Sequence, residues 1–530
     1  MKTKMKKMLG YLKSLGNNRL TQKIALIFLG VSSTIWFLIR VIPKPQRATY
    51  PCMRVAAPFI STLVVYLLSL WGTAAAYKQA KKYFKLSRYL MAGVFLIGVM
   101  FFLGVFLTQN SRSVLAYENV LEVNSPVGAA RGIFPGKVSW VFNPGVAKFD
   151  GETGFWWDDS NTVQAETDKL LTEAVLDVTG KKNEKKAWDA LFEHFNSTKR
   201  DKKLGYTAGE KIAIKINQNN TFSHEDNKNI NASPHLILSL LKSMINEAGI
   251  PQNCITVFDN SRFITDNIYD KCHAEFPDVF FVDNIGGNGR VKSTYELDAM
   301  KWSSENNKSI YTGIASCAVE ADYLINMAIL KGHQFQGVTL CAKNWFGATN
   351  IHNDFHLNKG AHYYFSANRE GKDTYMTFAD FMGHKDLGEK TMLFLVDAIY
   401  GQNSVSGVPH LKWQMKPFNN RWPSSLFASQ DGVAIDAVGI DFLRSEWPDM
   451  PDLQDAEKYL IEAAQADNPP SKTFYDPEKD GIKCKSLGVM ETWNSYEQKQ
   501  YSRNLGANLG IDLNFVDLTV SKRVRKYKNE

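Results

Sequence analysis

The sequence lacks the short motifs that most often identify a cofactor or a catalytic group. No two of its six cysteines stand at CxxC spacing, which excludes a zinc knuckle and a ferredoxin-like run of iron–sulfur ligands. It contains no GxSxG elbow, and "IGGNGR" (285–290) has neither the full GxGxxG pattern nor a Walker lysine, so this stretch predicts a turn. No iron–sulfur, serine-hydrolase or P-loop chemistry is therefore expected.

The first 112 residues contain no aspartate or glutamate. Three apolar stretches lie among them, at 24–39, 55–77 and 89–108, and each is close to the roughly 20 residues that a bilayer core requires. A cleaved signal peptide is the alternative for the first stretch, but two more stretches follow and no small-residue cleavage site precedes Pro43. We therefore expect a three-helix membrane anchor over residues 24–108, with the lipid bilayer as a partner.

The basic residues beside these stretches predict the orientation. Residues 1–23, a basic tail, carry seven lysines and arginines, and residues 78–88 carry five, against three in the loop 43–54. Because the cytoplasmic side keeps Lys and Arg, the N-terminus is expected in the cytoplasm. Three crossings then place everything after about residue 109 outside, which in a bacterium is the periplasm, so the predicted location is the inner membrane with a periplasmic C-terminal domain.

The formal net charge of +8 belongs to the membrane-proximal part. Seventeen of the 62 basic residues lie in residues 1–112, which leaves 45 basic and 54 acidic residues, a net charge of −9, in the remainder. A nucleic-acid partner is therefore not expected, since no basic stripe follows the anchor.

The remainder alternates short apolar runs with longer amphipathic ones. In residues 210–261, "KIAIKI" has strand character, Ser233 and Pro234 begin a helix, Gly249 ends it, and "CITVFD" is the next strand, which together make a βαβ unit. The prediction is an α/β domain at 126–520 with a mainly parallel sheet and flanking helices, between a linker at 109–125 and a charged tail at 521–530. The further strand candidates are 138–142, 279–282, 324–329, 338–342 and 392–396, and the further helix candidates are 162–178, 186–195, 433–445 and 454–466.

Polar residues follow the predicted strands, and ligands of open α/β sheets bind outside the carboxyl ends of the strands. "LINMAILKGHQFQGVTLCAKNWFG" (324–347) places Lys331, His333, Lys343 and Asn344 just after apolar runs. These groups suit a carboxylate or phosphate, and a desolvated lysine could also act as a base. The structural alternative pairs the lysines internally. Their candidate partners are Asp397, Asp431 and Asp436.

"NIHNDFH" (350–356) offers a second kind of site. On a helix, His352 and His356 would share a face and could bind a divalent metal, with Asp354 or His362 completing the set. The flanking asparagines and Gly360 favour a loop with ordinary histidines, so both interpretations stay open.

"INMAILKGHQFQGVTLCAKNWFG" resembles the signature of the domain-of-unknown-function family 362, in which an apolar strand leads to K-x-H, a G-V-T turn and K-N-x-F-G. The resemblance extends over about residues 125–445, through "IAIKIN" (212–217), "LVDAIYG" (395–401) and "ASQDGVAIDAVGIDFL" (428–443). The membrane segment with "YPCMRVAAP" (50–58) looks like the variant of Bacteroidota-type members. By position, the resemblance implies these site residues: Lys215, Asn217, Lys331, His333, Lys343, Asn344, Asp397, Asp431 and Asp436.

The family's activity is not established, so the resemblance implies no reaction. Some relatives carry ferredoxin-like cysteine motifs, which this sequence lacks, and a redox role is therefore disfavoured. We expect a site that binds an anionic small molecule, with Lys331 and Lys343 as anion contacts and with His333 and Asn344 orienting the ligand. Asp397, Asp431 and Asp436 would act as acid or base groups or would support the residues that touch the ligand, and the site could catalyse proton transfer or hydrolysis. The rival expectation is a non-catalytic component of an envelope protein complex, whose lysines are satisfied by internal carboxylates.

Overall fold

The computed structural model describes residues 77–86, part of 88–97, and residues 122–304, 312–333, 337–350, 375–450 and 456–520. Contacts divide the chain into two units, Met1–Val120 and Leu121–Glu530. The predicted spans 24–39 and 55–77, apart from Tyr77, and most of 89–108 lie outside the described residues, as do most of the linker and the tail 521–530. Within what is described, no helix is both long and apolar enough to cross a bilayer. The membrane anchor therefore stays a prediction.

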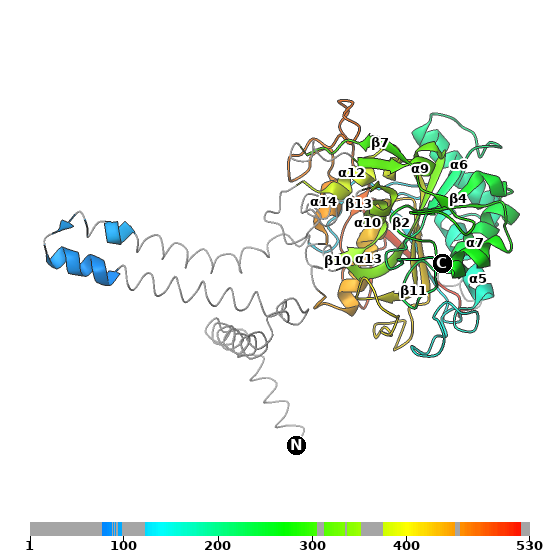
Figure 1. Cartoon of the computed structure of the whole chain (residues 1–530), viewed down its shortest axis with the longest axis horizontal. Coiled ribbons are helices and arrows are strands. Elements are labelled where there is room, and N and C mark those ends of the chain that lie inside the picture. The colour runs from blue at the N-terminus through cyan, green and yellow to red at the C-terminus, as the bar shows by residue number, and fades with distance from the viewer. Residues whose placement is uncertain are drawn as a thin grey trace, which may run out of the picture. The chain divides into compact units, whose positions relative to one another are not determined.

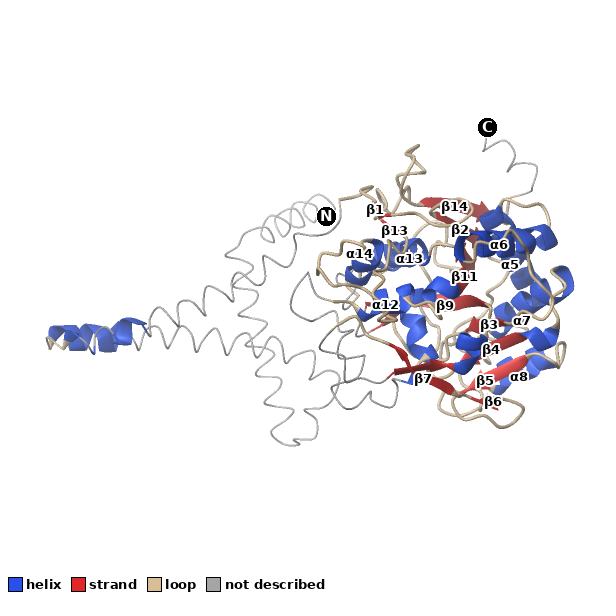
Figure 2. Cartoon of the chain, turned by 90° about the horizontal axis from the view of Figure 1, so that it is seen from above, coloured by secondary structure: helices blue, strands red, loops and turns tan. Residues whose placement is uncertain are grey.

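In the second unit, ten of the fourteen described strands form one mixed sheet (Figures 1 and 2). Two further pairs, β1 (Val127–Gly128) with β13 (Val489–Met490) and β7 (Tyr295–Met300) with β8 (Thr312–Ala315), form separate two-stranded sheets. The strands of the mixed sheet run in the order β14 (Asp512–Asp517), β2 (Lys137–Phe142), β12 (Ser425–Ser429), β11 (Thr391–Gln402), β9 (Tyr323–His333), β3 (Ile212–Lys215), β4 (Ile255–Asp259), β5 (Phe280–Asp283) and β6 (Val291–Lys292), and β10 (Gly337–Thr339) pairs with β9. From β11 to β6 every neighbouring pair along this order is parallel, as the sequence predicts. The pairs of β12 with β11 and β2, and of β10 with β9, are antiparallel.

Six of the nine described strand pairs in this sheet are parallel, so the sheet is mainly parallel, and the antiparallel part is an addition that the sequence did not predict. Residues 403–424, between β11 and β12, contain no helix, so the chain returns beside β11 in the opposite direction rather than through a helical crossover. The predicted strand 338–342 is also shorter than expected. β10 ends at Thr339 and the chain turns into the short helix α10 (Cys341–Asn344).

The predicted βαβ unit is present as β3, α7 (Pro234–Lys242) and β4. The Ser233 hydroxyl accepts a hydrogen bond from the Leu236 N–H at 3.4 Å, and Pro234 occupies the first helical turn, as the sequence indicates. The other predicted helices are observed as α5 (Gln164–Thr179), α6 (Glu184–Lys199), α13 (Gly432–Glu446) and α14 (Lys458–Ala464).

Two hydrophobic cores lie on opposite faces of the sheet, and β9 shows how the sequence separates them. Leu324, Ala328 and Leu330 belong to one core, whereas Tyr323, Ile325, Met327 and Ile329 belong to the other. This period-2 alternation of apolar side chains is what a strand buried on both faces requires. Helices α5, α6, α7 and α8 (Asp266–His273) cover the second face, and α10, α12 (Thr377–Gly383), α13 and α14 cover the first (Figure 2).

Candidate functional site

A polar pocket opens at the carboxyl ends of three neighbouring strands, β3, β4 and β9. It has about 320 Å³ of empty volume, part of which is open to solvent. The lining residues are Lys215, Asn217, Asn219, Asp259, Ser261, His333, Thr339, Lys343, Asn344, Phe346 and Gly347. Residues from distant parts of the chain meet here because parallel strands end at the same edge of the sheet, which is where α/β proteins place their ligands.

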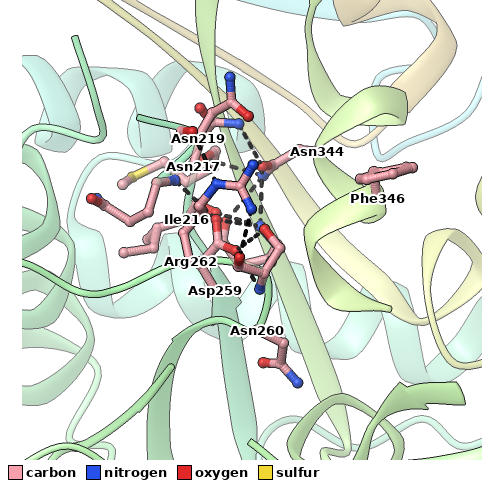
Figure 3. A network of polar contacts seen from close by, with 12 residues as sticks. Ile216, Asn217, Asn219, Asp259, Asn260, Arg262, Asn344 and Phe346 are labelled. Atoms are coloured by element: carbon pink, nitrogen blue, oxygen red, sulfur yellow. Dashed lines mark hydrogen bonds and ion pairs between the residues drawn. The ribbon is translucent and has the colours of Figure 1, made fainter. Parts of the chain in front are cut away.

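A buried ion pair between Lys215 and Asp259 forms one wall of this pocket, and Figure 3 labels its carboxylate, Asp259. The Lys215 ammonium, 1% exposed, lies 3.1 Å from Asp259 Oδ2 and also donates to the Ile216 carbonyl. Asp259 accepts further hydrogen bonds from the Gln218 N–H and from the N–H and hydroxyl of Ser261. Burial lowers the pKa of Lys215, although the Asp259 charge opposes this shift. Asp259 therefore holds the Lys215 ammonium and two loops at the ends of β3 and β4.

Asn344, on α10, ties two strands, β3 and β9, to this wall. Its Oδ1 accepts hydrogen bonds from Lys215 Nζ at 3.3 Å and from the Asn217 amide at 3.2 Å. Its Nδ2 donates to the Lys215 carbonyl, to Asn326 Oδ1 and to the Met327 carbonyl. The amide is therefore fully used, and the predicted orienting role of Asn344 takes the form of fixing α10 over β3 and β9.

Lys343 lies next to Asn344 on α10 and lines the same pocket. Its ammonium sits 4.1 Å from the centre of the Phe346 ring, a cation–π distance. Burial, together with the nearby positive charges of Arg262 and Lys215, lowers the pKa of Lys343 to about 7. An amine with this pKa exchanges protons near neutral pH, which is what a group engaged in acid–base chemistry requires.

Lys331 and His333 lie two residues apart on β9, so their side chains point to the same face of the sheet. His333 lines the pocket, whereas Lys331 is fully buried and is not part of the lining. Burial lowers the pKa of Lys331 to about 7. Burial and the charges of Lys343 and Lys331 hold the pKa of His333 well below its ordinary value.

Asp397 lies on β11, on the same face as Lys331. Its carboxylate accepts hydrogen bonds from the Ile399 N–H at 3.0 Å and from the Ser233 N–H at 3.2 Å. Burial raises the pKa of Asp397 to about 6. Asp397 is not among the pocket-lining residues, and its contacts hold the N-terminus of α7 against β11.

Asp431 and Asp436 bind backbone N–H groups away from the pocket lining. Asp431 is the N-cap of α13 and accepts hydrogen bonds from Val433 and Ala434, and its second oxygen accepts from the N–H groups of Arg131 and Val489. Asp436 accepts from the N–H groups of Cys341 and Ala342, at the start of α10, and from the Tyr459 hydroxyl. Burial raises the pKa of Asp431 to about 6 and that of Asp436 to about 7. These contacts give Asp431 a capping role and make Asp436 a positioning residue for Lys343 and Asn344.

The predicted metal ligands His352 and His356 lie outside the described residues. Among the residues that are described, no group of three His, Cys, Asp or Glu side chains is placed to hold a metal ion. The five described cysteines, at positions 254, 272, 317, 341 and 484, are all free thiols.

Sequence reasoning did not assign Asp259, Ser261, Asn219 or Arg262 to the site. Asp259 is one of the polar residues that end a predicted strand, but its position there did not by itself mark it as a site residue. Ser261 and Arg262 lie in the loop after it, and the Arg262 guanidinium donates to the carbonyls of Asn219 and Ser261. The position of these groups depends on loop geometry that no sequence pattern specifies.

Comparison with known families connects this geometry to one of them. Residues 212–441 match the model of a family described as "Domain of unknown function (DUF362)". The matched range runs from β3 into α13, and it contains every site residue that the resemblance implies, which supports that resemblance. The more specific assignment to a membrane-anchored Bacteroidota-type variant stays a prediction. A comparison with curated proteins found no match.

Proposed function

Starting from a DUF362 domain with a polar pocket at the edge of its sheet, we propose that this protein binds the oxyanion group of a small molecule, a phosphate or a carboxylate, in that pocket. The observation that carries the proposal is the composition of the lining. Two ammonium groups, three asparagine amides and two hydroxyls line one small pocket, and Asp259 is its only carboxylate among the described residues.

The negative charge of Asp259 is already engaged by one ammonium and three further hydrogen-bond donors. The lining therefore has an excess of positive charge and of donors, which an oxyanion would balance. In the described part of the chain, Asn217 Oδ1 is buried without a hydrogen-bond partner. A ligand hydroxyl beside the oxyanion would satisfy it, because a buried acceptor left unpaired is costly.

In this proposal Lys343 contacts the anion directly, while Asn217 and Asn219 supply amides and His333 orients the ligand from β9. Lys215 contributes positive charge from within its ion pair with Asp259. Asp436 acts through α10 and does not touch the ligand.

A second candidate function is proton transfer at a position next to the bound oxyanion, catalysed by Lys343. The observation in its favour is the pKa of Lys343 of about 7, which allows the amine both to accept and to donate a proton near neutral pH. Hydrolysis is the other reaction class that the residues suit.

Thermal unfolding of the full chain in detergent tests the binding proposal. Sulfate, phosphate and malonate should each raise the melting temperature, while potassium chloride at matched ionic strength should not. An anion at 100 times its Kd stabilises the folded state by about 2.7 kcal/mol. Lys343→Met should abolish this stabilisation while the ligand-free melting temperature stays near that of the wild type.

The matched control is Lys185→Met, which removes an exposed lysine on α6 and should leave the anion effect unchanged. The rival function, a non-catalytic component of an envelope complex, predicts instead that no anion stabilises the wild type. The absence of cysteine motifs disfavours a third alternative, a redox protein. If that alternative were correct, the purified chain would contain bound iron or an absorbing cofactor.

We also propose that residues 24–108 anchor the domain in the inner membrane, with the N-terminus in the cytoplasm and the binding pocket on the periplasmic side. The support is the charge asymmetry of the first 112 residues. A divalent metal at His352 and His356 is a further proposal, tested by metal analysis of the purified wild type and of the double alanine variant.

A further inference from the structure

Lys331 is a buried amine with very little to support a positive charge. Its side chain is fully buried, and its one described hydrogen bond runs to the Ile230 carbonyl oxygen at 3.4 Å. Among the described residues it forms no ion pair. A protonated amine without a close counter-ion in the protein interior costs several kcal/mol, so this geometry favours the neutral amine.

The charged groups around Lys331 come from three strands. Asp397 on β11 and Asp259 on β4 favour the protonated amine from beyond ion-pair distance, but both carboxylates are engaged in other contacts. His333 lies on β9 itself and lines the pocket. The charges of Lys343 and Lys331 both lower its pKa, so His333 is electrostatically coupled to both lysines. The Tyr400 hydroxyl, also on β11, senses the charge of Asp397.

A negative charge in the pocket would change this balance. His333 and Lys343 line the pocket, and the Lys331 side chain points to the same face of β9 as His333. Because the dielectric constant of a buried site is low, an anion in the pocket would act on the Lys331 amine much more strongly than it would across water. The anion would therefore supply the counter-charge that Lys331 otherwise receives only from engaged carboxylates.

We propose that the pocket binds its oxyanion together with a proton, which the amine of Lys331 takes up from solvent. This inference rests on the oxyanion binding proposed above and adds to it a pH-regulated step. For Lys331, the proton balance is one H⁺ from solvent added to one amine, which becomes an ammonium. This residue therefore gains one positive charge for each anion bound.

The direction of the pH dependence follows from the ligand-free site. The pKa of Lys331 is lowered to about 7 by burial, and a bound anion must raise it. Below pH 6 the amine is already protonated and binding takes up no proton. Above pH 7 each anion must bring a proton with it, so the affinity falls by up to about tenfold per pH unit for each amine that titrates.

Isothermal titration of the full chain with sulfate tests this inference, since sulfate itself does not titrate near neutral pH. At pH 8, heats measured in PIPES and in Tris should differ by the ionisation enthalpy of the buffer multiplied by the number of protons taken up. Lys343 has a similar pKa, so the wild type should take up between about one and two protons per sulfate. Lys331→Met should lower this number by about one and still bind sulfate, while Lys185→Met should not change it.

The outcomes separate the inference from the function on which it rests. Sulfate binding with heats independent of the buffer would overturn proton coupling and leave oxyanion binding intact. An unchanged proton number in Lys331→Met would show that another group takes up the proton. No sulfate binding under any condition would overturn both proposals. If Lys331→Met does not fold, the wild-type affinity between pH 7 and pH 9 decides, because a fall no steeper than about tenfold per pH unit would be accounted for by Lys343 alone and would overturn the role of Lys331.

Discussion

The ion pair between Lys215 and Asp259 allows a prediction whose size and pH dependence both follow from the structure. Asp259→Asn keeps the shape of the side chain but removes its charge, and so leaves the Lys215 ammonium, 1% exposed, without a counter-ion. Removal of one partner of a buried ion pair costs about 3–5 kcal/mol. The free energy of unfolding at pH 6, measured by urea titration of the full chain, should fall by this amount.

The same variant should recover stability as the pH rises. With Asp259 neutralised, the pKa of Lys215 in the folded state falls further below its unfolded value of about 10.4, so the unfolded state binds more protons over that interval. Stability therefore increases with pH, by up to about 1.4 kcal/mol per pH unit. In the double variant Lys215→Met, Asp259→Asn the amine is absent, and this extra pH dependence should disappear.

A loss of less than about 1 kcal/mol in Asp259→Asn would place the pair in the weak class of surface salt bridges. That result would refute the conclusion that Asp259 is committed to holding Lys215. The excess of donors in the pocket, on which the binding proposal rests, would then be smaller.

Three other predictions follow from particular contacts. Lys331→Met should raise the free energy of unfolding at pH 7, by about 1.4 kcal/mol for each unit by which the pKa of Lys331 is lowered from its ordinary value, minus any cost of repacking. It should also reduce, by the share of this one amine, the gain in wild-type stability between pH 7 and pH 10, to which Lys343 and Lys215 contribute as well; a destabilised variant would contradict a neutral buried amine. Asp436→Ala should lower the free energy of unfolding by about 1–3 kcal/mol, because two N–H groups of α10 lose their acceptor, and should weaken sulfate binding in titration calorimetry. Asp431→Ala, by contrast, should destabilise the fold without changing the sulfate Kd of the folded fraction. A reporter enzyme fused after Glu530 should be active only in the periplasm, and activity confined to the cytoplasm would reverse the predicted orientation.

The sequence predicted the part of the fold that has strong local signals. The βαβ unit follows from the Ser233–Pro234 start of α7 and from apolar runs of strand length. The position of polar residues after predicted strands pointed to Lys331, His333, Lys343 and Asn344, of which the last three line the pocket, whereas Lys215 was implied only by the family resemblance. Strand β12 was not predicted, so its antiparallel placement beside β11 was missed too, and the connection 403–424 has no periodic pattern that distinguishes a return from a crossover.

The division of roles among the site residues was the least predictable feature. Asp431 lies two residues before the predicted helix 433–445 and directly before the observed α13, so the N-cap rule could have identified its structural role. The contact of Asp436 with α10 joins residues about 95 positions apart and has no local signal. Two similar buried lysines differ in their position relative to the pocket, because Lys343 lines it and Lys331 does not, and that difference depends on three-dimensional packing alone.

The most direct test of the central claim is a crystal structure of the full chain with tungstate, a heavy oxyanion with strong anomalous scattering. The account predicts an anomalous peak in the pocket, within hydrogen-bond distance of Lys343 Nζ and of the Asn217 amide. An empty pocket at a tungstate concentration that occupies exposed lysines elsewhere on the molecule would contradict it.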